Sequence, residues 1–155
     1  MTRATADLYD EFGDDLQSMS MQLRSFGGRA TFEGPVRTIR CFEDNALVKA
    51  TLATAGDGAV LVIDGDGSLN TALMGDLIAA SAVANGWAGV VIHGAIRDSV
   101  ALGDLDLGVK ALGTNPRKSS KFGAGDVDVD LEFGGVVFRV GRRLYADADG
   151  ILVER

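Results

Sequence analysis

The sequence predicts a mixed α/β fold in which helices lie against a largely buried sheet. Two short apolar runs, 59–63 and 89–92, are bounded by glycine and polar residues, which is typical of central strands covered on both faces. Stretches with helical spacing of apolar residues stand between and before them. Beyond residue 125 apolar and polar residues alternate, which adds a β-rich tail. Together these patterns predict an α/β or β/β/α layered domain with a mixed sheet and flanking helices.

Length and composition are those of an ordinary folded domain. The 155 residues are 46% hydrophobic and 24% charged, so we expect a single domain over residues 1–155 with a real core. There are 21 glycines and only two prolines, and the glycines follow no fixed period. This usage indicates many tight turns in a folded chain rather than disorder.

The formal net charge of −7 limits the classes of partner. An acidic surface repels phosphate, so direct binding to RNA, DNA or an anionic membrane is not expected. The single cysteine, Cys41, cannot form an internal disulfide, and no apolar run approaches the roughly 20 residues of a membrane span. Residues 1–7 contain no signal-peptide apolar region, so we expect a cytoplasmic protein.

The first elements are expected between residues 5 and 42. Thr5 or Asp7 can cap a helix that places Leu8, Phe12 and Leu16 on one face at fourfold spacing. Residues 26–42 alternate apolar and polar side chains and are interrupted by Gly34–Pro35. Two strands separated at that break are predicted, because proline cannot donate to a strand ladder.

A helix and a central strand follow. Asp44 is the expected N-cap of a helix over 45–54 that packs Leu47, Ala50 and Leu52 inward and is closed by Gly56. Residues 59–64 then read as the first central strand. The loop Gly65–Ser68 is either a phosphate cradle or a plain turn. A turn is favoured, because the sequence has neither the glycine spacing of a dinucleotide fingerprint nor a Walker lysine.

The next stretch holds the candidate site. A helix is predicted over 75–85, ended by Gly86, with an inner face made of Leu77, Ile78, Ala80, Ser81 and Ala84. The second central strand, 89–93, is expected to turn sharply at Gly94–Ala95 into Ile96, Arg97 and Asp98. Arg97 and Asp98 would then lie just past the carboxyl end of a strand, where open α/β sheets tend to bind ligands.

Each of these polar groups has a structural and a functional interpretation. Asp76 is either a capping acid or part of a site in which the free amides of Gly75 to Ile78 receive a carboxylate. Arg97 and Asp98 are either a surface ion pair or, with Asp76, a divalent-metal site beside an anion site. His93 is expected to be a structural histidine and Cys41 a small buried hydrophobe. One histidine supports neither a zinc cluster nor a Ser-His-Asp triad.

The remainder of the chain is expected to be mostly β. A strand is possible over 108–112, and 114–121 is the one basic run, which is either a solvated loop or a rim for an anionic ligand. Val127, Val129, Leu131 and Phe133 would share one face, followed by strands near 136–138 and 151–153. Residues 145–150 faintly suggest a calcium loop, but a turn is favoured because the full ligand set is missing.

Several segments carry a family resemblance. Asp76, followed after twenty residues by Arg97-Asp98, resembles the metal-binding pattern of the class II 4-hydroxy-4-methyl-2-oxoglutarate aldolases, which also decarboxylate oxaloacetate. Segments 26–30, 41–45, 85–95 and 144–147 resemble the regulator of ribonuclease E activity A. These are two branches of one RraA-like superfamily. The resemblance implies a swivelling, phosphohistidine-domain-like β/β/α fold and a homotrimer with clefts at the subunit interfaces.

The resemblance also implies roles for individual residues. Asp98 would ligate Mg²⁺ or Mn²⁺, and Asp76 would hold the ion through water. Arg97 and the amides of Gly75, Asp76, Leu77 and Ile78 would bind the pyruvyl end of a small 2-oxo acid. Asp64 would line the site without acting. The implied reaction is retro-aldol cleavage of 4-hydroxy-4-methyl-2-oxoglutarate to two pyruvates, with oxaloacetate decarboxylation through the same enolate.

A second function is open at this stage. The chain stops at residue 155, without the C-terminal extension of the longer aldolases, and matches the ribonuclease regulator in length. The alternative is therefore a non-catalytic inhibitor that binds a ribonuclease E-type protein, whereas Asp98 favours the lyase. A menaquinone-pathway methyltransferase finds no support, because no glycine-rich nucleotide loop follows a first strand. For the lyase, loss of the Asp98 carboxylate is expected to abolish activity and leave folding nearly intact.

Overall fold

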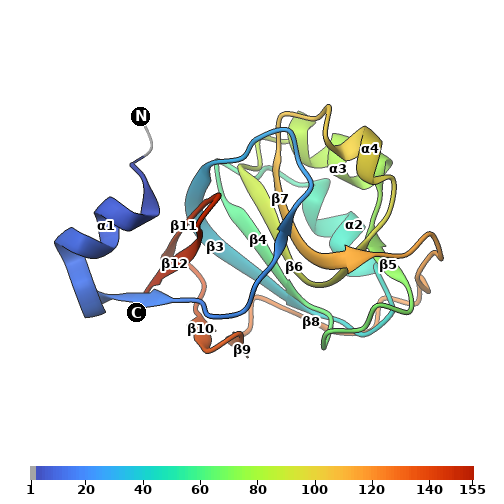
Figure 1. Ribbon diagram of the computed structural model, residues 1–155. Helices are drawn as coiled ribbons and strands as arrows, with labels where there is room; N and C mark the ends of the chain where they lie inside the picture. The colour runs from blue at the N-terminus through green and yellow to red at the C-terminus, as the bar shows by residue number, and fades with distance from the viewer. Residues whose placement is uncertain (1–2) are drawn as a thin grey trace.

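The computed structural model describes residues 3–155 as a mixed sheet flanked by helices, which confirms the predicted fold class (Figure 1). Four parallel strands form its centre in the spatial order β3 (Phe32–Arg40), β4 (Val60–Asp64), β6 (Gly89–Ile96) and β7 (Gly108–Thr114). The helices of the described residues are α1 (Thr5–Phe12), the 3₁₀ helix η1 (Gly13–Asp15), α2 (Ala46–Leu52), α3 (Asp76–Ala84) and α4 (Ser99–Leu102).

Antiparallel strands extend the sheet at both sides. On one side β11 (Arg143–Asp147), β12 (Gly150–Glu154) and β1 (Leu16–Ser18) follow β3 in that order. Two further antiparallel strands are β2 (Arg24–Ser25) beside β7 and β8 (Asp126–Val127) beside β3, whereas β5 (Ala72–Met74) pairs in parallel with β6. A separate hairpin, β9 (Leu131–Phe133) with β10 (Val136–Phe138), completes the fold.

The core lies on both faces of the parallel strands. Leu61 and Ile63 of β4 pack in a cluster with Val48 and Leu52 of α2. Val60 and Val62, which alternate with them, belong to a second cluster that includes the β9–β10 hairpin. Because successive side chains of a strand point to opposite faces, a strand between two apolar layers must be apolar throughout. This is why the run 59–63 was recognisable as a central strand.

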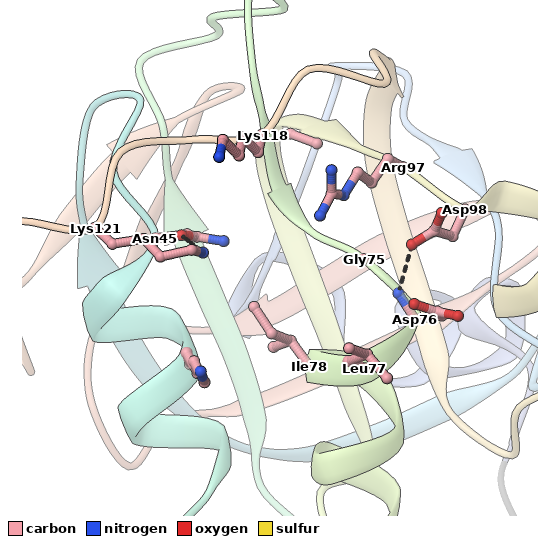
Figure 2. A pocket seen from close by; sticks show the side chains of 11 residues that line it. Asn45, Gly75, Asp76, Leu77, Ile78, Arg97, Asp98, Lys118 and Lys121 are labelled. Carbon is pink, nitrogen blue, oxygen red and sulfur yellow. Dashed lines mark hydrogen bonds between the residues drawn. The ribbon is translucent and has the colours of Figure 1, made fainter.

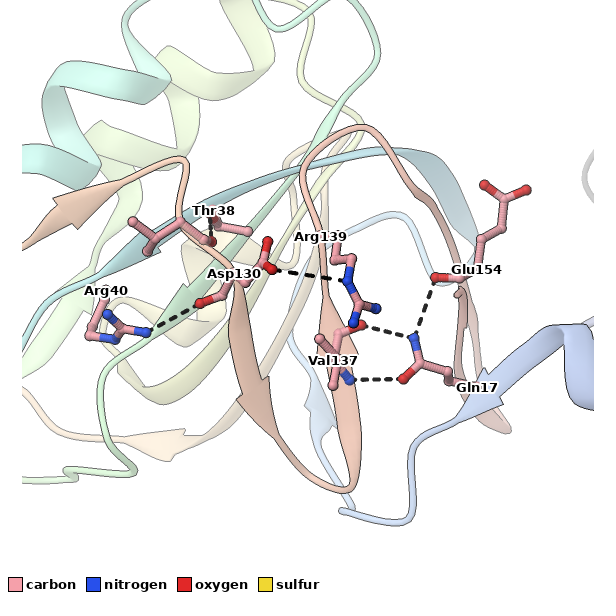
Figure 3. Close-up of polar contacts among 8 residues, drawn as sticks. Gln17, Thr38, Arg40, Asp130, Val137, Arg139 and Glu154 are labelled. Carbon is pink, nitrogen blue, oxygen red and sulfur yellow. Dashed lines mark hydrogen bonds and ion pairs between the residues drawn. The ribbon is translucent and has the colours of Figure 1, made fainter.

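The β9–β10 hairpin is held to the main sheet by the buried side-chain amide of Gln17 (Figure 3). The Gln17 Nε2 atom donates to the carbonyl oxygen of Val137 at 2.9 Å and to that of Glu154 at 3.4 Å, while its Oε1 accepts the Val137 amide at 2.9 Å. Gln17 is 8% exposed, so each of these polar groups is satisfied away from water. One side chain of β1 therefore ties β10 to β12.

Residues 26–42 do not form the two predicted strands. They include one long strand, β3, which continues through Pro35. The strand changes partner at this proline: residues 32–35 pair with β11, and residues 36–40 pair with β4. Pro35 lies at the changeover, so its missing N–H interrupts neither ladder in the middle.

The predicted turn at Gly94–Ala95 is also wrong. β6 continues to Ile96 with a register shift between Ile92 and Ala95, because both β5 and β7 pair with its last residues. The strand over 108–112 is confirmed and runs on to Thr114. The turn predicted over 145–150 is confirmed only at residues 148–149, which connect the β11–β12 hairpin; residues 145–147 belong to β11, a strand that was not predicted.

The helices are present, but several inner faces differ from the prediction. α1 ends at Phe12, which is 45% exposed, and Leu16 belongs to β1; neither Thr5 nor Asp7 is its N-cap, which is Ala4. α2 is shorter than 45–54, and Ala50 is exposed. α3 begins and ends close to the predicted residues, yet it buries Ala79 and Ala82 and leaves Leu77 83% exposed. In the tail, Val127 is 38% exposed and departs from the predicted face, whereas Val129 packs partly buried against the cluster that contains Leu131 and Phe133. No helix within residues 3–155 is long and apolar enough to cross a membrane.

Candidate functional site

The start of α3 and the end of β6 lie side by side. β5 leads directly into α3, and it pairs in parallel with β6, so both segments leave the sheet at the same edge. The Arg97 amide donates to the Met74 carbonyl at 3.0 Å, which joins the two exits just before Gly75. The structure thus brings together the residues that the sequence singled out: Gly75, Asp76, Leu77, Ile78, Arg97 and Asp98.

These residues form part of a pocket of about 230 Å³ (Figure 2). One wall is the start of α3, another is the Arg97–Asp98 segment, and the remaining wall comes from α2 and the basic loop 114–121. The lining residues are Asn45, Lys49, Ala72, Gly75, Asp76, Leu77, Ile78, Arg97, Asp98, Lys118 and Lys121.

Asp98 is locked to the start of α3. Its Oδ2 atom accepts the Asp76 amide at 3.0 Å, so it caps a helix that begins 22 residues earlier. Asp98 has φ 58° and ψ 42°, a left-handed conformation that aspartate tolerates better than most residues. Gly75 makes the contact possible, because a Cβ atom there would lie 2.7 Å from Asp98 Oδ2. The hydrogen bond also corrects one expectation: the Asp76 amide is already used and is not free for a ligand.

Arg97 and Asp98 are not an ion pair. Among residues 3–155 no carboxylate forms a salt bridge with Arg97, and the only hydrogen bond of its side chain is a long one from Nη1 to the Pro116 carbonyl at 3.4 Å. The guanidinium points into the pocket (Figure 2). Most of its five donors are therefore free to bind an anion in the bidentate manner that suits carboxylates.

The basic side of the pocket was missing from the predicted site residues. Lys118 and Lys121 come from the loop that the sequence left open as an anionic rim, and Lys49 comes from α2. Lys121 Nζ donates to Asn45 Oδ1 at 3.1 Å. The available signal was a basic run in an acidic chain, but its position opposite Asp98 is a matter of tertiary structure.

The carboxylates of the pocket suit a hard divalent cation that keeps water and substrate ligands. They do not form a closed site in which protein side chains fill the coordination shell. Within residues 3–155 no three His, Cys, Asp or Glu side chains are arranged to hold a metal ion. Asp76 and Asp98 are the only carboxylates among the residues that line the pocket in the described part of the chain. Mg²⁺ is commonly held by one or two carboxylates, with water and substrate oxygens as the other ligands, and Mn²⁺ also suits oxygen donors. The donor set therefore fits Mg²⁺ or Mn²⁺.

The other reactive side chains lie outside this pocket. His93 Nδ1 is 2.9 Å from Asp64 Oδ1, and its ring stacks on Phe133 at a centroid distance of 4.6 Å. Asp64 lines a separate pocket, so it does not line the candidate site as the resemblance implied. Cys41 is 3% exposed, and burial, assisted by nearby carboxylates, raises the pKa of its thiol to about 12. The histidine has packed structural contacts and the thiol stays protonated.

Asp44 anchors the loop that carries the basic residues. Its carboxylate accepts the amides of Ala46, Phe122 and Gly123 at 3.1, 2.7 and 3.2 Å. Burial alone would raise the pKa of Asp44, but these amide hydrogen bonds outweigh it and hold the pKa below its ordinary value. The N-cap of α2 is Asn45 and not the predicted Asp44, but Asp44 still links the first turn of α2 to the end of the basic loop.

Comparison with known proteins identifies the family. Residues 5–153 match the family model "RraA-like: Aldolase/RraA", which covers nearly the whole chain. The chain belongs to the RraA-like family. The family includes aldolases and inhibitors of RNA processing, and the recognised resemblance is confirmed.

Solved structures of this RraA-like family share the fold closely. A protein described as an S-adenosylmethionine:2-dimethylmenaquinone methyltransferase, from Geobacillus kaustophilus, is 51% identical with a TM-score of 0.97; the match covers 98% of this chain and 94% of that one. The RNA-processing inhibitor RraA from Thermus thermophilis is 49% identical with a TM-score of 0.96, over 99% and 93%. Streptomyces coelicolor RraAS2, described as an unusual member of the RNase ES inhibitor RraA family, is 27% identical with a TM-score of 0.79, over 97% and 79%.

Proposed function

We propose that this RraA-like protein is a divalent-metal-dependent carbon-carbon lyase. Its substrate would be 4-hydroxy-4-methyl-2-oxoglutarate, cleaved to two pyruvates, with oxaloacetate decarboxylation as a side activity. The observation that carries the proposal is the convergence of Asp76, Arg97 and Asp98 on one pocket at the start of α3. These groups are the hard oxygen ligands and the guanidinium that such a reaction needs.

The two carboxylates would have different roles toward the metal. The Asp98 carboxylate accepts the Asp76 amide through Oδ2 and, with lone pairs still free, would ligate Mg²⁺ or Mn²⁺. Asp76 would hold the ion through water. The ion would supply Lewis-acid chemistry toward the keto oxygen of the 2-oxo acid.

Arg97 and the first turn of α3 would hold the pyruvyl end. The amides of Leu77 and Ile78 lie in the first turn, where a helix offers no internal acceptor, and together with the helix dipole they favour an anion. Arg97 would donate to the oxygen that becomes negative when the carbon-carbon bond breaks. No histidine lines the pocket, so a water molecule in the open site would carry the proton.

An assay with purified protein tests the reaction. With Mg²⁺ or Mn²⁺ the protein should release pyruvate from 4-hydroxy-4-methyl-2-oxoglutarate or from oxaloacetate. Arg97→Gln should lower kcat/KM by about a hundredfold or more, because removing one hydrogen-bond donor to a developing negative charge typically lowers the rate by that factor. A rate no higher than a metal-only blank would reject the lyase.

A second candidate is a protein-binding regulator of RNA processing. It is favoured by the 49% identity to the Thermus inhibitor and by the net charge of −7. The segment of α1 and η1 exposes five acidic side chains: Asp7, Asp10, Glu11, Asp14 and Asp15. Such a surface suits a basic segment of a ribonuclease E-type partner rather than nucleic acid.

Salt dependence tests this regulator. Binding to a ribonuclease E-type scaffold should weaken steeply between low and physiological ionic strength, because exposed charges are screened. Salt-insensitive binding, or no binding at low salt, would count against it. Methyl transfer is not proposed, because the sequence has no glycine-rich nucleotide loop after a first strand.

A further inference from the structure

The Arg97 guanidinium stands between two pockets. One is the candidate pocket at the start of α3, and the other is a neighbouring pocket of about 280 Å³. The residues that line this second pocket are Arg97, Asp98, Ser99, Thr114, Asn115 and Pro116. An arginine side chain has many rotamers, and holding it in one of them costs conformational entropy. Whatever holds the guanidinium toward the first pocket therefore determines whether its donors face an anion there.

Two contacts of Arg97 set the direction of its side chain. The side chain passes over Gly75, where an added Cβ atom would lie 3.3 Å from both Cγ and Nε of Arg97. The tip donates from Nη1 to the Pro116 carbonyl oxygen at 3.4 Å. With its middle against the start of α3 and its tip on a carbonyl, the guanidinium points into the candidate pocket (Figure 2).

Asn115 fastens the segment that carries this carbonyl. Its Oδ1 atom accepts the Arg117 amide at 2.9 Å, and its Nδ2 atom donates to the Leu69 carbonyl at 2.7 Å. The backbone amide of Asn115 donates to the carbonyl of Ile96, the residue before Arg97, at 3.0 Å. Asn115 follows β7 directly, so it joins the end of β6, the loop before β5 and the basic loop.

The bond from the Arg117 amide is the one that orients the Pro116 carbonyl. The ring of proline fixes φ but not ψ, so Pro116 alone does not determine where its carbonyl points. The Pro116 carbonyl and the Arg117 amide belong to one planar trans peptide group, in which C=O and N–H point in opposite directions. When Asn115 Oδ1 accepts the amide, the carbonyl on the other side of the peptide is fixed as well.

We propose that Asn115 is a positioning residue for Arg97. It orients the peptide between Pro116 and Arg117, and the carbonyl of that peptide holds the guanidinium toward the candidate pocket. The inference rests on the proposed function where it concerns the reaction, because Arg97 is taken there to bind the 2-oxo acid. Asn115 does not line the candidate pocket, so it acts through Arg97 and not on the substrate.

The mobility of the Arg97 side chain tests this role without metal or substrate. Nuclear magnetic resonance relaxation of the Arg97 Nε–Hε group, assigned by the signal that Arg97→Lys loses, measures how restricted the side chain is. Asn115→Ala should lower the order parameter of this group toward that of a flexible side chain. Asn115→Ser keeps an acceptor near the Arg117 amide but does not reach Leu69, so it should give an intermediate value.

Unchanged order of Arg97 in both Asn115 variants overturns the proposal. Thermal melting checks that each variant is folded. If Asn115→Ala does not fold, Asn115→Ser decides, and an order parameter equal to that of the wild type then counts against the role.

Asn70→Ala is the matched control. Asn70 follows Leu69, and its Nδ2 atom donates to Glu43 Oε2 at 3.0 Å, but it lines neither pocket. The variant thus removes an exposed asparagine hydrogen bond from the same region without touching the peptide after Pro116. Arg97 should keep its wild-type order. If Asn70→Ala frees Arg97 as much as Asn115→Ala does, the effect is a general loosening of the loops and the positioning role is wrong.

A double-variant cycle tests the same link in the reaction. Asn115→Ala should lower kcat/KM for pyruvate release by about tenfold or more, because misplacing a group by about 1 Å can lower a rate by up to about a hundredfold. In an Arg97→Gln background the same change should have little further effect, since its influence passes through Arg97. Fully additive losses would show that Asn115 acts independently of Arg97, which overturns the proposal.

The outcome is separable from that of the lyase assay. If the wild type releases no pyruvate while Asn115→Ala frees the Arg97 side chain, the proposed reaction fails and the positioning role stands. If pyruvate is released and Arg97 keeps its order in the Asn115 variants, the reaction stands and the positioning role fails.

Discussion

At the scale of single residues, Asp98 combines an architectural contact with a candidate ligand position. Its left-handed backbone and its hydrogen bond to the Asp76 amide fasten the end of β6 to the start of α3. The expectation that its carboxylate can be removed at little cost to folding is therefore revised. The cap needs only an acceptor oxygen, whereas the proposed metal role needs the negative charge of the carboxylate, so the two can be separated by substitution.

Asp98→Ala and Asp98→Asn separate the two roles. Alanine loses the cap and tolerates the left-handed backbone poorly, so it should lower the free energy of unfolding by about 1–3 kcal/mol. Asparagine keeps an acceptor oxygen and tolerates this backbone, so its stability should stay close to wild type. Both should abolish metal-dependent pyruvate release. Chemical denaturation and the pyruvate assay measure the two effects, and an active Asp98→Asn protein would refute the ligand assignment.

At the scale of elements, α1 is fastened to the sheet by a carboxylate from a distant strand. Asp147, at the end of β11, accepts the Thr5 amide at 2.8 Å and the Thr5 hydroxyl at 2.7 Å. The helix has no side-chain cap of its own and buries only Thr5 and Leu8. Burial would raise the pKa of Asp147, but hydrogen bonds from Thr5 and from the amides of Asp149 and Gly150 hold it below its ordinary value.

The Thr5–Asp147 hydrogen bonds should make the packing of α1 against the sheet sensitive to acid. Because the pKa is lower in the folded state, the carboxylate contributes stability that is present above its unfolded pKa, near 3.9, and is lost as the pH falls through the folded pKa. Hydrogen exchange of the α1 amides should therefore speed up in acid relative to the central strands, after correction for intrinsic rates. Asp147→Asn should speed hydrogen exchange of the α1 amides already at neutral pH. Unchanged exchange in that variant would contradict the role of the Thr5–Asp147 hydrogen bonds.

At the scale of the whole molecule, the candidate site opens beside exposed apolar side chains. Leu77, at the start of α3, is 83% exposed, and Val100, in the short helix after Asp98, is 87% exposed. The pocket also offers a metal only two carboxylates. Both features suit a site that lies next to a neighbouring subunit, as the family resemblance implies.

A homotrimer is therefore expected in solution. Light scattering should give about three times the chain mass of 16.2 kDa. Val100→Asp, which places a charge on the exposed apolar surface, should shift the population toward smaller species while the far-ultraviolet circular dichroism stays unchanged. A stable wild-type monomer at micromolar concentration would exclude an interface site.

Local pattern was sufficient for the central strands and for the positions of α2 and α3. A strand buried on both faces must be continuously apolar, and a helix start rich in small and acidic residues is chemically distinctive. The group of Asp76, Arg97 and Asp98 was also recognisable, because its spacing matches a family pattern. Their approach in space follows from the parallel pairing of β5 with β6.

Other features depend on partners that a linear pattern does not show. Pro35 stays within β3 because β11 and β4 share that strand, and β6 extends past Gly94 because two neighbours pair with its end. Leu77 was expected to be buried, yet it faces outward, since the orientation of α3 is set by the packing of Ala79 and Ala82. Lys118 and Lys121 belong to a basic run that comes well after Asp98 in the sequence, yet they line the same pocket as Asp98. Their placement comes from the loop's hydrogen bonds to β5 and to the residues just before α2, which are contacts between distant segments.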